Sequence, residues 1–163
     1  MTETTRKIIL SGNAGVGKTS LVSRYVHDRF LNKYPSSIGV RIDRKELEIN
    51  DSILDMIIWD LSSKSSQADV PQSYLLRTSG VIYVVDISEP STFENISEDI
   101  SFLKKKLPGI LIIIVANKSD KVNQAEINAI INTMPVKPDF ISSAKDSVNV
   151  IEIFHRLGEL MLS

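Results

Sequence analysis

The sequence contains no cysteine. Disulfides, thiolate metal sites, cysteine nucleophiles and cysteine-linked lipids are therefore excluded for the chain as given, and this composition suits a reducing compartment. The charge is balanced as well: 19 basic and 20 acidic residues leave a net charge of −1, so nothing suggests a nucleic-acid-binding protein. No apolar run reaches the about 18 residues of a membrane span, and the N-terminus lacks the apolar core of a signal peptide. We therefore expect a soluble, cytoplasmic protein.

A chain of 163 residues with 42% hydrophobic and 24% charged residues is typical of one globular domain, which we place at residues 1–163. Apolar runs of strand length alternate with helical patterns, which predicts an α/β fold with a mostly parallel sheet. Asn50-Asp51 separates two such runs by a tight turn, so this pair is expected to be antiparallel. The expected strands are residues 6–11, 40–49, 52–60, 81–87, 110–116 and 138–142, and the expected helices are residues 17–27, 71–78, 91–106, 123–133 and 148–161.

The segment Gly12–Thr19 fits the pattern G-x-x-x-x-G-K-[ST] of a phosphate-binding loop. It lies between the expected strand 6–11 and the expected helix 17–27, which is the position that such a loop occupies. Glycines allow successive backbone N–H groups to surround phosphate oxygens at the positive end of the helix. Lys18 is expected to reach the β- and γ-phosphates, and the Thr19 hydroxyl to ligate Mg²⁺. The chain is therefore predicted to bind a nucleoside phosphate.

Two further elements follow expected strands and concern the base. Asn117–Asp120 has the form N-K-x-D, and the carboxylate of Asp120 can accept hydrogen bonds from N1–H and N2–H₂ of guanine. Adenine offers no matching donors, so it would leave this carboxylate without partners. Ser142–Lys145 follows the last expected strand, where a backbone N–H can meet guanine O6. N-K-x-D alone also occurs in surface turns, but the three elements in this order favour a guanine nucleotide over ATP.

With these elements, the chain resembles the Ras superfamily of small GTPases, and its Rab branch most closely. The resemblance covers essentially the whole chain. It implies the P-loop small GTPase fold, with a six-stranded, mostly parallel sheet, one antiparallel strand, helices on both faces and two nucleotide-sensing loops, switch I and switch II. The further motifs that carry the resemblance are Ser37-Ile38-Gly39-Val40, Trp59-Asp60, Val84-Val85-Asp86-Ile87 and the segment Ser91–Ile96.

The resemblance also implies roles for individual residues. Phe30 would lie edge-on against the guanine and Tyr34 across the phosphates, although both rings could simply pack their loop. Ser37, where the family usually has Thr, would ligate Mg²⁺ together with Thr19, and Asp60 would hold the ion through water. The residues implied to bind GTP or GDP are Asn13, Ala14, Gly15, Val16, Gly17, Lys18, Thr19, Ser20, Phe30, Tyr34, Ser37, Asn117, Lys118, Asp120, Ser143, Ala144 and Lys145.

The chain departs from the family after Asp60, where Leu61-Ser62-Ser63-Lys64 replaces the usual Thr-Ala-Gly-Gln. Ser63 stands for the glycine that contacts the γ-phosphate and serves as the pivot of switch II, and its Cβ restricts the backbone there. Lys64 stands for the glutamine that orients the attacking water, and lysine has three donors but no acceptor. No catalytic residue is therefore assigned.

These departures leave three interpretations open. In the first, the chain binds GTP, hydrolyses it very slowly or not at all and acts as a binding platform. In the second, it is a GDP-bound or nucleotide-indifferent scaffold. In the third, it is a working GTPase for which a partner supplies the missing groups or Lys64 stabilises the γ-phosphoryl charge. The alternative for Lys64 is a solvated lysine in a serine-rich loop. An ATP-dependent kinase or ATPase is disfavoured by Asn117–Asp120 and Ser143–Lys145.

The resemblance implies a face for effector or regulator proteins as well. Arg41, Ile42 and Leu76 stand where the family usually has Asp, Phe and Arg, so we expect an unusual set of partners. Trp59 could instead belong to ordinary sheet packing. Relatives anchor to membranes through C-terminal cysteines, so membrane association is expected only if a lipidated tail is missing from this chain. The residues implied for the partner face are Ile38, Gly39, Ile42, Trp59 and Tyr74.

Overall fold

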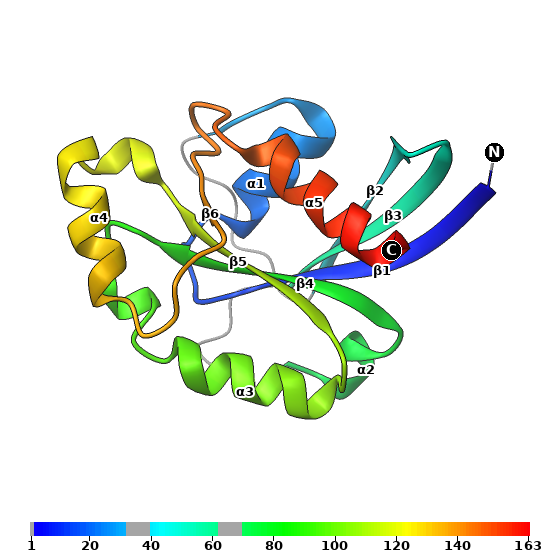
Figure 1. Ribbon diagram of the computed structural model, residues 1–163, viewed down its shortest axis with the longest axis horizontal. Helices are drawn as coiled ribbons and strands as arrows, with labels where there is room; N and C mark the ends of the chain where they lie inside the picture. Colours follow the sequence, from blue (N-terminus) through cyan, green and yellow to red (C-terminus); the bar gives the residue numbers. More distant parts are fainter. Residues whose placement is uncertain (1, 32–39, 62–69) are drawn as a thin grey trace.

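The computed structural model describes residues 2–31, 40–61 and 70–163. Its sheet has six strands in the order β2-β3-β1-β4-β5-β6 (Figure 1). Strand β2 runs antiparallel to β3, and the other neighbouring pairs are parallel, so the predicted fold class is confirmed. The strands are β1 (Thr2–Ser11), β2 (Val40–Ile49), β3 (Ser52–Leu61), β4 (Thr78–Asp86), β5 (Leu111–Asn117) and β6 (Phe140–Ile141).

Helices cover both faces of the sheet. Helices α1 (Lys18–His27) and α5 (Val150–Leu162) pack on one face, above the sheet in Figure 1, with one apolar cluster beneath them. Helices α2 (Gln72–Leu75), α3 (Ile96–Lys106) and α4 (Gln124–Thr133) contribute to a second cluster on the other face. No helix within the described ranges combines the length and the apolarity needed to cross a membrane.

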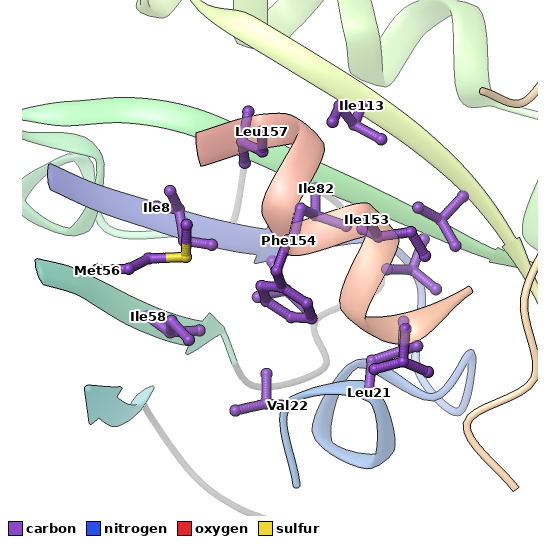
Figure 2. Packing of buried hydrophobic residues seen from close by; sticks show 14 of the residues in the cluster. Ile8, Leu21, Val22, Met56, Ile58, Ile82, Ile113, Ile153, Phe154 and Leu157 are labelled. Atoms are coloured by element: carbon purple, nitrogen blue, oxygen red, sulfur yellow. The ribbon is translucent and has the colours of Figure 1, made fainter. Parts of the chain in front are cut away.

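Phe154 shows how the core holds the helix that follows the phosphate loop. Figure 2 shows its side chain projecting from α5 among Ile8, Ile58 and Val22, and it is fully buried. Its ring stacks on that of Tyr25 in α1, with centroids 4.1 Å apart and an interplanar angle of 3°. Complete burial of such a side chain contributes about 1.5–3 kcal/mol. The stack therefore ties α1 to α5 and to the sheet.

The turn between β2 and β3 is the hairpin that the sequence predicts. Asn50 and Asp51 both have left-handed backbones, with φ of 48° and 63°, and Ile49 pairs with Ser52 across the turn. Two positive φ values in a two-residue loop define a type I′ turn, whose twist matches that of the strands. The hairpin places β2 at the edge of the sheet beside β3.

The expected helix at residues 71–78 is wrong in extent, because α2 spans Gln72–Leu75 alone. Leu76 is extended, and Arg77 has a left-handed φ of 60° that ends any helix. The chain then enters β4 at Thr78, three residues earlier than expected.

Two more expected elements are corrected. The expected helix 91–106 is divided into a 3₁₀ turn at Pro90–Thr92, labelled η2, and α3, which begins only at Ile96. The hydroxyl of Thr92 bonds the backbone of the turn, donating to the carbonyl of Glu89 at 2.8 Å, which favours a turn over a helix. The expected strand 138–142 is reduced to Phe140–Ile141; its first residue is proline, which has no N–H for a ladder.

Candidate nucleotide-binding site

The phosphate-binding loop joins the end of β1 to the start of α1. Its backbone has positive φ at Gly12 (138°), Gly15 (76°) and Gly17 (102°). A Cβ at Gly12 would lie 2.2 Å from the carbonyl oxygen of Val84, and one at Gly17 would lie 2.3 Å from Nδ2 of Asn117. Glycine alone fits these two positions, so the loop lies directly against β4 and against the first residue of the N-K-x-D motif.

Lys18 is the first residue of α1, and its side chain folds back over the loop. Its Nζ donates to the carbonyl of Gly12 at 2.6 Å and to that of Asn13 at 3.1 Å. The residue is 5% exposed, and burial lowers the pKa of Lys18 to about 8, against the opposing charge of Asp60. The ammonium group is thus held inside the loop at the place where the motif requires a phosphate contact.

This lowered pKa predicts how nucleotide binding depends on pH. Anionic phosphates favour the ammonium form, so the pKa of Lys18 should be higher in the complex than the value of about 8 that burial sets. Affinity should then be constant below pH 8 and fall as pH rises above it, by up to about tenfold per unit. Dissociation constants for GDP between pH 7 and pH 9 measure this. A flat profile would contradict the expectation, and Lys18→Arg, which stays protonated, is the control.

Thr19 of α1 meets Asp60 of β3. Thr19 Oγ1 donates to Asp60 Oδ2 at 2.5 Å, and Asp60 is 3% exposed. Burial raises the pKa of Asp60, opposed by the Thr19 hydrogen bond and the charge of Lys18. A hydroxyl and a carboxylate are oxygen ligands that Mg²⁺ takes together with nucleotide phosphates, so this pair fits a nucleotide-bound magnesium ion. Within the described ranges, no group of three or more His, Asp or Glu residues could hold a metal ion by itself.

Asn117 and Lys118 connect the N-K-x-D motif to the phosphate loop through hydrogen bonds. Asn117 Nδ2 donates to the carbonyl of Val16 at 3.1 Å, and Lys118 Nζ donates to that of Gly15 at 2.5 Å. Lys118 also forms an ion pair of 3.3 Å with Asp86 at the end of β4. The two hydrogen bonds join residues that are 101 and 103 positions apart in the sequence. The phosphate loop and the N-K-x-D motif therefore form one structural unit.

Asp120 lies beside the third motif, Ser142–Lys145. Ser143 Oγ donates to Asp120 Oδ1 at 2.8 Å and accepts the backbone N–H of Asp146 at 2.9 Å. Asn117 Oδ1 accepts a hydrogen bond from the hydroxyl of Ser142 at 3.0 Å. Asp120 is exposed, so a base can approach its carboxylate. All three motifs thus meet beyond the carboxyl ends of the parallel strands, where such sheets bind ligands.

Residues 7–163 of the sequence match the Ras family. The chain belongs to the Ras family. It is similar to Ras-related protein Rab-13 of Mesocricetus auratus, at 30% identity over 162 residues that cover 96% of this chain and 79% of the relative. Rab-32D of Dictyostelium discoideum is 33% identical over 177 residues, covering 99% of this chain and 76% of the relative. Rab-15 of Homo sapiens is 29% identical over 161 residues, covering 96% and 76%. The predicted Rab-like resemblance is confirmed.

Other expected nucleotide residues of this Ras-family chain lie around the loop. Asn13 Nδ2 donates to the carbonyl of Ser91 at 3.5 Å, while Ala14 is exposed and Ser20 is half-buried on α1. Phe30 is partly buried against the cluster beneath α1 and α5, and its contact with guanine stays a prediction. The expected functional residues that lie outside the described residues are Tyr34, Ser37, Ile38, Gly39, Ser63 and Lys64.

Three residues of the expected partner face come together. Ile42 pairs with Trp59 in the register of β2 and β3, and the ring of Tyr74 meets Trp59 edge-on, with centroids 5.8 Å apart. Ile42 is 52% exposed, and Leu76, just after α2, is 65% exposed. We call Ile42, Trp59, Tyr74 and Leu76 the Trp59 face.

Lys7 of β1 contacts three members of the Trp59 face. Its Nζ lies 3.7 Å from the ring centroid of Trp59 and donates to the carbonyls of Tyr74 at 2.6 Å and Leu76 at 2.9 Å. A cation over a tryptophan ring is attracted by the ring quadrupole. The lysine therefore fixes the end of α2 against β3, although the sequence pattern places it in an ordinary strand.

Asp86 is a residue whose role the sequence reasoning did not assign. It is 3% exposed at the end of β4, and its Oδ1 accepts the backbone N–H and the hydroxyl of Ser88 at 2.9 and 2.6 Å. Its other oxygen pairs with Lys118. The signal in the sequence was an acidic residue directly after an uninterrupted apolar strand, where a carboxylate needs a specific partner to be buried.

Proposed function

We propose that this chain is a guanine-nucleotide-binding, Rab-like protein that binds GTP with Mg²⁺, hydrolyses it very slowly or not at all and serves as a platform for other proteins. The observation that carries the proposal is the direct bonding of the base motif to the phosphate loop through Asn117 and Lys118. A role in vesicle trafficking is part of this proposal because of the chain's resemblance to the Rab branch.

In this proposal, each end of the nucleotide has its own residues. Lys18 and the N-terminus of α1 receive the phosphates, and the acceptor oxygens of Asp120 select guanine by its N1–H and N2–H₂. Thr19 and Asp60 would hold Mg²⁺, which neutralises phosphate charge when bound. Slow hydrolysis is attributed to Ser63 and Lys64, which replace the Gly and Gln of the family, and these two residues lie outside the described residues.

The test is to denature freshly purified protein and to identify the released nucleotide by chromatography. Near-stoichiometric GTP would support a platform that keeps the triphosphate. Predominant GDP would support either a working GTPase or a GDP-bound scaffold, and a single-turnover assay on GTP-loaded protein separates these two. No nucleotide, together with no binding of added GDP or GTP, would contradict the proposal.

The Trp59 face is the proposed site for effectors or regulators. Beside it lies a groove of about 720 Å³ whose lining includes Ile57, Trp59 and Leu76, with the cations Lys7 and Arg77. Arg77 is held at a φ of 60°, a strained backbone for a residue with a Cβ. An apolar groove with cationic side chains suits a partner segment that carries both apolar and acidic residues. Ile42 and Leu76 are exposed aliphatic residues at positions where the family usually has Phe and Arg.

Trp59→Ala should reduce capture of partners by the GTP-loaded protein at least about tenfold, because buried tryptophans dominate interface energies. Quantitative mass spectrometry of proteins captured from a lysate measures this, and a thermal melt checks that the variant is folded. Ile151→Ala is the control for loss of an apolar side chain elsewhere on the surface, because Ile151 is 63% exposed and lies on α5. If Trp59→Ala recovers the same proteins as the wild type, this face is not the partner site.

A further inference from the structure

Arg24 of α1 reaches the loop after β6, 120 residues further along the chain. Its Nε donates to the carbonyl of Ala144 and its Nη2 to that of Lys145, each at 2.9 Å. A third nitrogen, Nη1, forms a 3.3 Å ion pair with Asp28, whose side chain is 89% exposed, whereas that of Arg24 is 18% exposed. The guanidinium group is thus mostly buried and donates to two neighbouring backbone oxygens of the loop that carries the Ser142–Lys145 motif.

These two bonds fix the orientation of two peptide planes. The C=O and N–H of a trans peptide point in opposite directions in one rigid plane. Holding the carbonyl of Ala144 therefore directs the N–H of Lys145 away from Arg24. Holding the carbonyl of Lys145 likewise directs the N–H of Asp146 away from Arg24. This N–H donates to Ser143 Oγ at 2.9 Å.

The second of these planes leads to Asp120. Ser143 Oγ accepts the N–H of Asp146 and donates its own proton to Asp120 Oδ1 at 2.8 Å. The guanidinium group is therefore connected, through one peptide and one hydroxyl, to the carboxylate expected to read N1–H and N2–H₂ of guanine. The N–H of Lys145 and the carboxylate of Asp120 are therefore both oriented by the same arginine side chain.

We propose that Arg24 is a positioning residue for guanine recognition, which orients the N–H of Lys145 toward O6 and, through Asp146 and Ser143, the carboxylate of Asp120. This inference rests on the proposed function, because it assumes that guanine occupies this site. Arg24 lies on the helix that starts with Lys18 and Thr19, so α1 serves the phosphates at its first turn and the base at its second. The planar fork of arginine matches two neighbouring carbonyls, whereas a lysine ammonium is a point donor.

The test compares two ligands that differ only at the base edge. GDP carries O6, N1–H and N2–H₂, and purine riboside 5′-diphosphate has none of them but keeps the sugar and both phosphates. Arg24→Met keeps an unbranched side chain that reaches about as far as Nε of the arginine and removes its donors. We expect the dissociation constant for GDP to rise on the order of tenfold or more, and that for the purine analogue to stay within about twofold. Both are measured by competition against a fluorescent GDP.

Asp28→Asn is the matched control, because it removes the charge of the exposed partner of Arg24 and leaves the bonds to Ala144 and Lys145 intact. It should bind both ligands like the wild type, and Arg24→Lys should lie between wild type and Arg24→Met for GDP alone. If Arg24→Met weakens both ligands by the same factor, or neither, the inference is overturned. If the wild type itself does not prefer GDP over the purine analogue, the proposed guanine specificity fails, which is a separate result. A variant that melts before binding is replaced by Arg24→Gln, to which the same criteria apply.

Discussion

Replacing Asp120 with asparagine is expected to exchange a preference for guanine for a preference for xanthine. The carboxylate can only accept, which suits the N1–H and N2–H₂ of guanine, whereas xanthine has an oxygen at C2 that requires a donor. Ser143 Oγ donates to Asp120 Oδ1 at 2.8 Å. An asparagine in this place would accept that bond through its oxygen, and its amide N–H₂ would then face the base.

The expected size of the effect follows from the two hydrogen bonds to a charged group that the variant loses. Each contributes roughly 1.5–3 kcal/mol, so GDP affinity should fall about 100-fold or more, while xanthosine diphosphate should gain affinity. Titration of nucleotide-free protein with both diphosphates measures the change. Asp146→Asn is the control, because it makes the same chemical change in an exposed neighbour whose backbone N–H, not its side chain, donates to Ser143. An Asp120→Asn variant that keeps its preference for GDP would show that Asp120 does not contact the base.

The central strands were predictable because helices cover both of their faces. Residues 81–85 of β4 are fully buried, since helices lie on both faces of the sheet, so the strand is an uninterrupted apolar run. The hairpin was predictable because Asn50 and Asp51 are residue types that accept positive φ. The prediction of a helix at residues 71–78 was wrong because the positive φ of Arg77 has no signature in the sequence. Only the pairing of Thr78 with Lys7 of β1 shows that the chain has already become a strand there.

The site residues that belong to continuous sequence motifs were predictable from the sequence. The residues that reach the site through contacts between distant parts of the chain were not. The phosphate loop is a continuous segment whose glycines are required by the close approach of Val84, so its motif is visible in the sequence. The contacts of Arg24 with Ala144 and Lys145 span 120 and 121 residues, and an arginine on a helix carries no pattern that predicts them. The same holds for Lys7 beneath the Trp59 face.

Restoring the family residues at the two divergent positions, with Ser63→Gly and Lys64→Gln together, should raise the rate of GTP hydrolysis on the order of 100-fold. The glutamine amide oxygen can accept a hydrogen bond from the attacking water, which the lysine ammonium, with donors alone, cannot do. The glycine regains the backbone freedom of a switch pivot. Single-turnover hydrolysis of GTP-loaded protein measures the change in rate.

The two single variants separate the two causes. Lys64→Gln acts on the water alone, so it should raise the hydrolysis rate and leave the ratio of GTP to GDP affinity unchanged. Ser63→Gly acts on the γ-phosphate contact, so it should shift that ratio toward GTP. Ser62→Ala is the control, because it restores a family residue beside them that has no part in either contact. A wild type that already hydrolyses GTP as fast as the double variant would instead support a working GTPase, in which Lys64 replaces the glutamine by stabilising negative charge on the γ-phosphoryl oxygens.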